Sequence, residues 1–221
     1  SLHPTPDMAF TQEDVQAALR TVVDPNTGKD LVATKSVRNV RVDGADVALD
    51  VELGYPARTQ IEPMKKLVSA ALKRLPGVGR ITVNVTSRIV SHSVQKGVKL
   101  IPNVKNIIAV ASGKGGVGKS TTAVNLALAL ASEGASVAML DADIYGPSQP
   151  TMLGISGRPE SSDGKTLEPM MGHGLQAISI GFLIDVDTPM VWRGPMVTQA
   201  LEQLLKDTRW RDVDYLVVDL P

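Results

Sequence analysis

Apolar positions in the first third of the chain follow helical and strand spacing in turn. Thr11 and Asp14 are spaced like a capping box in front of a helical pattern. Asp43-Gly44 separates two strand-like apolar runs, the second of them in strict alternation, which is typical of a β-hairpin. The predicted order is helix, strand, strand, helix and strand, over 11–22, 37–42, 47–51, 61–75 and 81–85. This pattern predicts a small α+β domain over 8–86.

The pattern changes after a stretch without sustained periodicity, 87–105, which we interpret as a linker. Continuous apolar runs then alternate with helical patterns, as in the βαβ units of a parallel sheet. The predicted elements are strand, helix, strand, strand, helix and strand, over 107–111, 119–134, 137–140, 175–180, 197–206 and 215–220. We therefore expect a second domain over 106–221, of α/β class, with a doubly wound, mostly parallel sheet. Its last strand has the fully apolar character of a central strand, so we expect an incomplete sheet and a piece of a longer protein.

A glycine-rich run joins the first of these strands to its helix: Gly113-Lys114-Gly115-Gly116-Val117-Gly118-Lys119-Ser120. It matches the P-loop pattern G-x-x-x-x-G-K-S in the strand-to-helix context that the pattern requires. Glycines let backbone N–H groups approach a polyphosphate, and the helix points its positive end at the anion. Lys119 would contact the β and γ phosphates and Ser120 would ligate magnesium. We expect the whole run and Thr121 to bind ATP.

Three aspartates follow apolar strands of the second domain. Asp141 and Asp143 come after the 137–140 run, and Asp219 closes the 215–220 run. In an open parallel sheet, ligands bind at the carboxyl ends of the strands. Asp219 is therefore a candidate for holding magnesium, directly or through water. For each of the three aspartates, a turn or capping role remains the alternative.

The composition argues against several classes of function. Lys and Arg total 23 and Asp and Glu total 23, so no net charge attracts nucleic acid or anionic lipid. No apolar run is long enough to span a bilayer, and we expect a cytoplasmic protein without nucleic-acid or membrane partners. The chain contains no cysteine, which excludes disulfides and thiolate ligation of zinc or iron by these residues.

Four segments resemble known families. Lys114-Gly-Gly-Val-Gly-Lys-Ser120 is similar to the deviant Walker A motif of the MinD/ParA/nitrogenase-reductase class. Asp141-Ala-Asp-Ile-Tyr-Gly-Pro-Ser148 and Val191-Trp-Arg-Gly-Pro-Met196 resemble segments of the Mrp/ApbC family of iron-sulphur cluster carrier ATPases. Asp24-Pro-Asn-Thr-Gly-Lys-Asp-Leu31 resembles the iron-sulphur assembly-type domain that precedes the ATPase in many bacterial members.

The resemblance implies an ATP-hydrolysing homodimer that delivers [4Fe-4S] clusters to apo-proteins. Lys114 would reach the partner's phosphates and stabilise developing charge, as an arginine finger does. Asp143 would be the switch aspartate that positions the attacking water, with Asp141 the second choice, and Asp219 the Walker B aspartate. Family members carry a Cys-x-x-Cys after the Walker B strand. This chain has no cysteine, so we expect the cluster only in the full-length protein, and ATP hydrolysis by residues 1–221 alone stays open.

Two other functions compete with this hypothesis. A MinD/ParA-like positioning ATPase would need a basic amphipathic helix or patch, which the composition does not favour. Alternatively, the small domain could be a non-enzymatic adaptor that docks client proteins while the P-loop domain senses nucleotide. The sequence predicts surface or linker positions for His3, His92 and His173 and packing roles for Trp192 and Trp210, and it leaves the role of Arg193 open.

Overall fold

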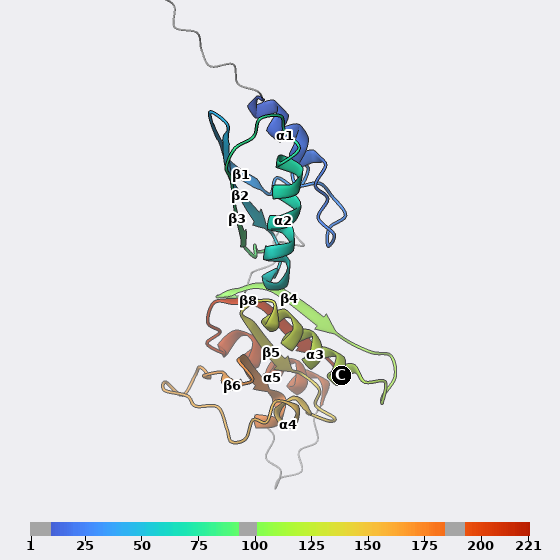
Figure 1. The fold of residues 1–221 in the computed structure, drawn as a ribbon. Helices are drawn as coiled ribbons and strands as arrows, with labels where there is room; N and C mark the ends of the chain where they lie inside the picture. Colours follow the sequence, from blue (N-terminus) through green and yellow to red (C-terminus); the bar gives the residue numbers. More distant parts are fainter. Residues whose placement is uncertain (1–9, 93–100, 184–192) are drawn as a thin grey trace, which may run out of the picture. The chain divides into compact units, whose positions relative to one another are not determined.

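The protein divides into two compact units, 1–89 and 90–221, in a computed structural model that describes residues 10–92, 101–183 and 193–221 (Figure 1). The division falls inside the interval that the sequence marks as a linker, 87–105. Several sequence-based expectations concern residues outside the described ranges: Met8, His3, Trp192, Val191 and the middle of the linker. Each unit has its own hydrophobic core.

The first unit has the predicted element order. Thr11 and Asp14 form the capping box in front of the first helix: Thr11 Oγ1 accepts from the Asp14 N–H at 3.2 Å, and Asp14 Oδ2 accepts from the Thr11 N–H at 2.7 Å. The elements are α1 (Gln12–Arg20), β1 (Val37–Asp43), β2 (Asp46–Leu53), a 3-10 turn η1 (Arg58–Gln60), α2 (Ile61–Leu72) and β3 (Ile81–Ser87). The predicted α-β-β-α-β order is confirmed.

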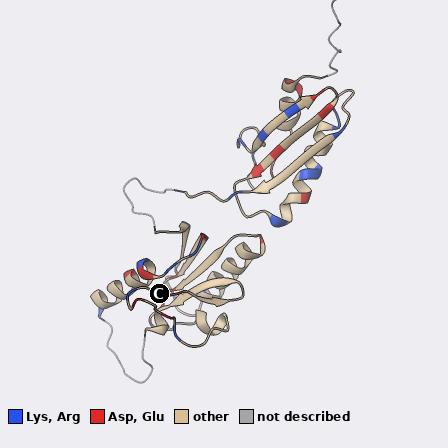
Figure 2. Ribbon diagram, turned by 90° about the vertical axis from the view of Figure 1, so that its left-hand side faces the viewer, with Lys and Arg blue, Asp and Glu red and all other residues tan. Residues whose placement is uncertain are grey.

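One face of a three-stranded sheet is covered by α1 and α2 (Figure 1). The strand order is β1-β2-β3, with β1 antiparallel and β3 parallel to β2. Alternate residues of β2, from Val47 to Leu53, enter the core with Leu19 and Met64. Figure 2 shows acidic positions along β2 beside basic positions on β1. The sheet is therefore amphipathic, with one apolar and one charged face.

A buried acidic residue stabilises the turn between α1 and β1. Asp24 is buried, and the Tyr55 hydroxyl donates to both of its carboxylate oxygens at 2.9 Å. Burial, assisted by the neighbouring Asp24, raises the pKa of Tyr55 to about 12. Gly28 closes the same turn with φ +67°, a conformation that glycine adopts without strain. The sequence predicted the turn but not the tyrosine that pairs with it.

The second unit contains a five-stranded sheet of order β4-β8-β5-β7-β6. The strands β4, β8, β5 and β7 are parallel, and β6 is antiparallel to β7. The elements are β4 (Val104–Val110), α3 (Lys119–Ser132), β5 (Val137–Asp141), α4 (Gln149–Met152), β6 (Met170–Gly172), β7 (Leu175–Ser179), a 3-10 turn η2 (Ile180–Phe182), α5 (Gly194–Asp207) and β8 (Val213–Asp219). The predicted mostly parallel α/β sheet is confirmed, and β8 is an interior strand.

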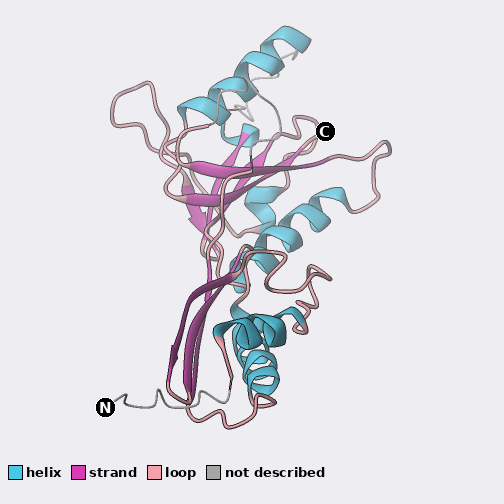
Figure 3. Cartoon of the chain, turned by 90° about the horizontal axis from the view of Figure 1, so that it is seen from above, coloured by secondary structure: helices cyan, strands magenta, loops and turns pink. Residues whose placement is uncertain are grey.

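Helices lie on both faces of this sheet (Figure 3). On one face, α5 contributes Leu204 to a core with Leu140, Leu216 and Trp210. On the other, α3 lies against β5 and β8 with Ala123 and other small residues buried. Every residue of β5 is buried, as expected for a strand covered on both sides. This arrangement is doubly wound.

The first strand of this sheet differs from the sequence-based prediction. It begins at Val104, inside the predicted linker, and ends at Val110. Its polar residues Lys105 and Asn106 concealed it, but both are bonded: Lys105 Nζ to Asp214 Oδ1 at 2.6 Å, and Asn106 Nδ2 to the Asp214 carbonyl at 3.1 Å. Both bonds go to Asp214 on β8, the strand beside β4 in the sheet.

Candidate functional site

The glycine-rich loop joins the carboxyl end of β4 to the amino end of α3. Two of its glycines have left-handed backbone conformations, Gly116 at φ +74° and Gly118 at φ +83°, which a side chain would strain. Gly118 is the N-cap of α3 and provides no side-chain hydrogen bond to the first turn. The N–H groups at the start of α3 therefore have no side-chain cap and remain available to an anion.

A cavity of about 410 Å³ lies over this loop. Its lining combines the loop, the first turn of α3 and the segment after β5. The lining residues are Ser112, Gly113, Lys114, Gly115, Gly116, Gly118, Lys119, Ser120, Thr121, Asp143, Ser148, Met152 and Pro221. All the predicted nucleotide-binding residues except Val117 line this cavity, and Val117 is 59% exposed. Lys114 lines the cavity and is exposed.

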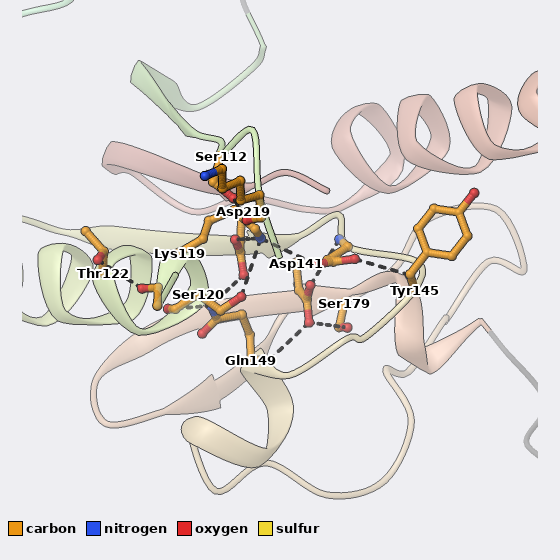
Figure 4. A network of polar contacts seen from close by, with 12 residues as sticks. Ser112, Lys119, Ser120, Thr122, Asp141, Tyr145, Gln149, Ser179 and Asp219 are labelled. Atoms are coloured by element: carbon orange, nitrogen blue, oxygen red, sulfur yellow. Dashed lines mark hydrogen bonds and ion pairs between the residues drawn. The ribbon is translucent and has the colours of Figure 1, made fainter. Parts of the chain in front are cut away.

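At the base of the site, the Lys119 ammonium lies among three oxygens (Figure 4). Lys119 Nζ donates to Asp219 Oδ1, and lies 3.4 Å from Asp143 Oδ2 and 3.4 Å from Ser120 Oγ. Burial acts to lower the pKa of Lys119, but the hydrogen bond and charge of Asp219, with smaller effects from Asp143, raise it overall. The lysine is therefore held as a cation close to the loop.

The structure gives the two aspartates after β5 different environments. Asp141 is fully buried, and its carboxylate accepts from the Asp143 N–H at 3.2 Å, the Gln149 N–H at 3.1 Å and Ser179 Oγ at 3.1 Å. Burial raises the pKa of Asp141 to about 6 against those hydrogen bonds. Asp143 instead lines the cavity and faces Lys119. Asp141 thus holds the segment after β5 in place. Asp143 is the aspartate of the two that a ligand can reach.

Strand register brings the acidic residues together. Asp219 at the end of β8 is opposite Val110 on one side and Asp141 on the other. The carboxyl ends of the three strands thus share one level, with Asp219 between the end of β4 and the end of β5. The sequence predicted each strand end, but not that β8 lies between β4 and β5.

Gln149, at the start of α4, was not predicted. Its Nε2 donates to Asp219 Oδ2 at 2.8 Å and to the Ser120 carbonyl at 3.0 Å. It follows the Tyr-Gly-Pro-Ser segment, in which nothing distinguishes a buried amide from a surface one. Tyr145, four positions before Gln149, is exposed, so helical spacing gives no sign that Gln149 is buried.

The oxygens around Lys119 fit magnesium by their chemistry. A hydroxyl and carboxylates are the hard donors that Mg²⁺ prefers, together with substrate phosphates and water. In this structure a protein cation, the Lys119 ammonium, already contacts Ser120 Oγ and Asp219 Oδ1. Within the described residues, no group of three or more His, Cys, Asp or Glu side chains forms an all-protein metal site.

The remaining candidates in the described ranges do not line this cavity. Trp210 is buried and donates from Nε1 to the Leu205 carbonyl at 3.0 Å, as expected for a packing residue. His92 lies beside Asn106, with Nδ1 3.2 Å from Asn106 Oδ1, and His173 is exposed in a turn. Arg193 is the exposed N-cap of α5. In the ranges that the structure describes, no helix is long and apolar enough to cross a bilayer.

Comparison with protein families assigns both units. Residues 103–221 match the ParA family model, described as NUBPL iron-transfer P-loop NTPase. The chain belongs to this iron-transfer P-loop NTPase family. Residues 12–85 match a second model, described as iron-sulfur cluster assembly protein. The predicted resemblance is confirmed for both units, and NTPase chemistry of the family agrees with the loop geometry.

Relatives of this P-loop NTPase are named iron-sulfur cluster carrier proteins. One from Synechocystis is 45% identical over 216 residues, which cover 96% of this chain and 61% of the relative. One from Escherichia coli K12 is 49% identical over 210 residues, covering 94% and 56%. This chain therefore spans little more than half the length of these relatives. A solved nucleotide-binding protein in complex with ADP from Archaeoglobus fulgidus is 38% identical, with a TM-score of 0.46, over 54% of this chain and 45% of that one.

Proposed function

We propose that this chain is the nucleotide-binding part of an ATP-hydrolysing carrier that delivers [4Fe-4S] clusters to apo-proteins. The main support is the contact of the Lys119 ammonium with Ser120, Asp143 and Asp219 beneath a cavity lined by the glycine loop. Relatives named iron-sulfur cluster carrier proteins support the same function. The cluster is the cargo, and because the 221 residues contain no cysteine, its thiolate ligands would lie outside them.

In this proposal Lys119 exchanges its carboxylate partners for the β and γ phosphates of ATP. The loop from Gly113 to Gly118 surrounds the phosphates with backbone donors, and Ser120 and Thr121 complete the first turn of α3. Ser120 and Asp219 would hold magnesium, Asp219 directly or through a water molecule. A magnesium ion held by these residues would supply positive charge against the negative charge that develops in phosphoryl transfer.

Hydrolysis in the proposed mechanism needs two more residues. Asp143 lines the cavity within 3.4 Å of Lys119, so its carboxylate is placed to orient an attacking water once the lysine has turned to the phosphates. Lys114 is exposed and lines the same cavity, which supports a role for it at the phosphates of a second copy. The proposal therefore includes a homodimer, with Lys114 stabilising transition-state charge across the interface.

The direct test is ATP binding by calorimetry with magnesium present. We expect Lys119→Ala to weaken ATP binding at least about a hundredfold, because the phosphates lose their main cation. Lys206→Ala is the control, since Lys206 forms an exposed ion pair with Glu202 on α5 and does not line the cavity. Equal affinity of Lys119→Ala and the unmodified chain would refute the nucleotide site.

The delivery function is tested on the full-length protein. A [4Fe-4S] cluster reconstituted on it should transfer to an apo-protein acceptor, and Lys119→Ala should slow that transfer while cluster absorbance is retained. A full-length protein that takes up no cluster would overturn the carrier proposal and leave an NTPase of another function.

A further inference from the structure

Gln149 joins three parts of the phosphate site although it does not line the cavity (Figure 4). Its side chain connects β8 to the first turn of α3, through Asp219 Oδ2 at 2.8 Å and the Ser120 carbonyl at 3.0 Å. Its backbone N–H donates to Asp141 Oδ2 at 3.1 Å. Gln149 is 1% exposed. An effect of this side chain on the reaction must therefore act through the residues it holds.

The chemistry of its neighbours fixes the orientation of this amide. Asp219 Oδ2 and the Ser120 carbonyl are both acceptors, so the NH₂ group, and not the carbonyl oxygen, has to face them. Oε1 is then buried and has no hydrogen-bond partner among the residues that the structure describes. An unpaired buried acceptor is unfavourable. The amide thus uses its NH₂ group for both contacts, and its carbonyl oxygen is left without a partner among the described residues.

Asp219 has two partners with different roles. Its Oδ1 accepts from Lys119 and its Oδ2 accepts from Gln149. If Lys119 turns to the phosphates, Gln149 Nε2 remains as the side-chain donor that fixes the carboxylate. We propose that Gln149 is a positioning residue for the metal: it holds Oδ2 of Asp219 and leaves Oδ1 available to magnesium. This inference rests on the proposed nucleotide function of the site.

The chain offers a matched pair of substitutions. Gln149→Met keeps the side-chain length and the backbone N–H to Asp141 but removes both amide donors. Gln176→Met is the control, because Gln176 is also buried and also makes two hydrogen bonds, from Nε2 to the Arg211 carbonyl at 2.7 Å and from the Arg211 N–H to Oε1 at 2.9 Å. Gln176 lies on β7 and does not line the cavity. A general packing defect would affect both variants.

The readout is the affinity for ADP, measured by calorimetry with magnesium and again with a chelator. The ratio of the two affinities reports how strongly the metal tightens binding. We expect Gln149→Met to reduce this ratio about tenfold, as changes beside metal ligands commonly do. Its affinity without metal should stay within about twofold. Gln176→Met should keep the unmodified ratio. An unchanged ratio in Gln149→Met would overturn the inference, whereas an unmodified chain that binds no nucleotide would overturn the proposed function.

Two further variants keep the test decisive. If Gln149→Met does not fold, Gln149→Asn retains an amide that is one methylene too short to reach both acceptors, and the ratio should fall again. In an Asp219→Asn background, Gln149→Met should change the ratio little further, because both act through one carboxylate. Independent, additive effects of the two substitutions would contradict a role exerted through Asp219.

Discussion

Asp141 illustrates how one side chain can serve the site without touching a ligand. Its carboxylate receives three donors from the segment after β5 and from β7, and it is inaccessible to solvent. Hydrogen bonds of this kind usually favour the charged form, but burial outweighs them here and raises the pKa of Asp141 to about 6. The native state therefore binds this proton more tightly than the unfolded chain does.

This pKa shift predicts a pH-dependent stability. The ordinary pKa of an aspartate is 3.8. The contribution of Asp141 to the free energy of unfolding is therefore largest below about pH 4 and falls as pH rises to about 6. The change should be on the order of 2 kcal/mol. Denaturant unfolding of the second unit from pH 4 to 7.5 should show this fall when Asp141→Asn is used as the reference. Asp212→Asn, an exposed carboxylate, is the control. A flat difference between pH 4 and 6 would contradict the assignment.

Lys114 should separate binding from turnover. It is exposed where it lines the cavity, whereas Lys119 is largely buried among carboxylates. We expect Lys114→Ala in the full-length protein to bind ATP within about threefold of the unmodified protein and to lose hydrolysis by at least about a hundredfold. Phosphate release and calorimetry measure the two quantities. Normal turnover in Lys114→Ala would contradict the proposed action of Lys114 on the phosphates of a second copy.

Residue types and spacing allowed the prediction of much of the site, because the glycine loop is a local motif. Gly116 and Gly118 adopt the left-handed conformations for which glycine is suited. Asp143 and Asp219 were predicted as strand-end residues, and both contact Lys119. Gln149 and Ser179 could not be predicted, because their partners are distant in sequence and depend on strand order. Local chemistry is visible in the sequence, and long-range hydrogen bonding is not.

At the scale of single elements, the capping box of α1 offers a clean test. Thr11→Ala removes the side-chain acceptor of the Asp14 N–H and should lower the free energy of unfolding of the first unit by about 1 kcal/mol. Gln12→Ala changes an exposed residue of the same turn and should be nearly neutral. Urea unfolding followed by circular dichroism measures both. A loss no larger for Thr11→Ala than for Gln12→Ala would show that the cap contributes nothing.

The accuracy of element prediction followed the strength of the apolar pattern. The strand of fully buried residues, β5, was predicted to within one residue. The start of β4 was missed because Lys105 and Asn106 interrupt the run, and the first turn of α5 was missed because it begins at Gly194-Pro195. The short β6 and α4 have three and four residues and carry no recognisable period.

For the whole molecule, separate cores predict separate consequences of core mutations. Met64 is fully buried in the first unit, and Met64→Ala should destabilise that unit by about 2–5 kcal/mol. ATP affinity should stay within about twofold, because the phosphate site lies wholly in the second unit. Met171→Ala, at a 62% exposed residue, controls for loss of a methionine. Loss of ATP binding in Met64→Ala would show that the units depend on each other.

The strand that carries the phosphate loop also has an exposed apolar surface. Among the described strands β4 pairs only with β8, and its Ile107 is half exposed. Residues 90–92 hydrogen-bond to Lys105 and Asn106 at the start of β4. An edge strand that lacks a second strand partner can template pairing with another chain. Sheet extension along β4 would brace the segment from which the glycine loop emerges. A strand added at this edge by another copy would make the support of the glycine loop depend on protein concentration.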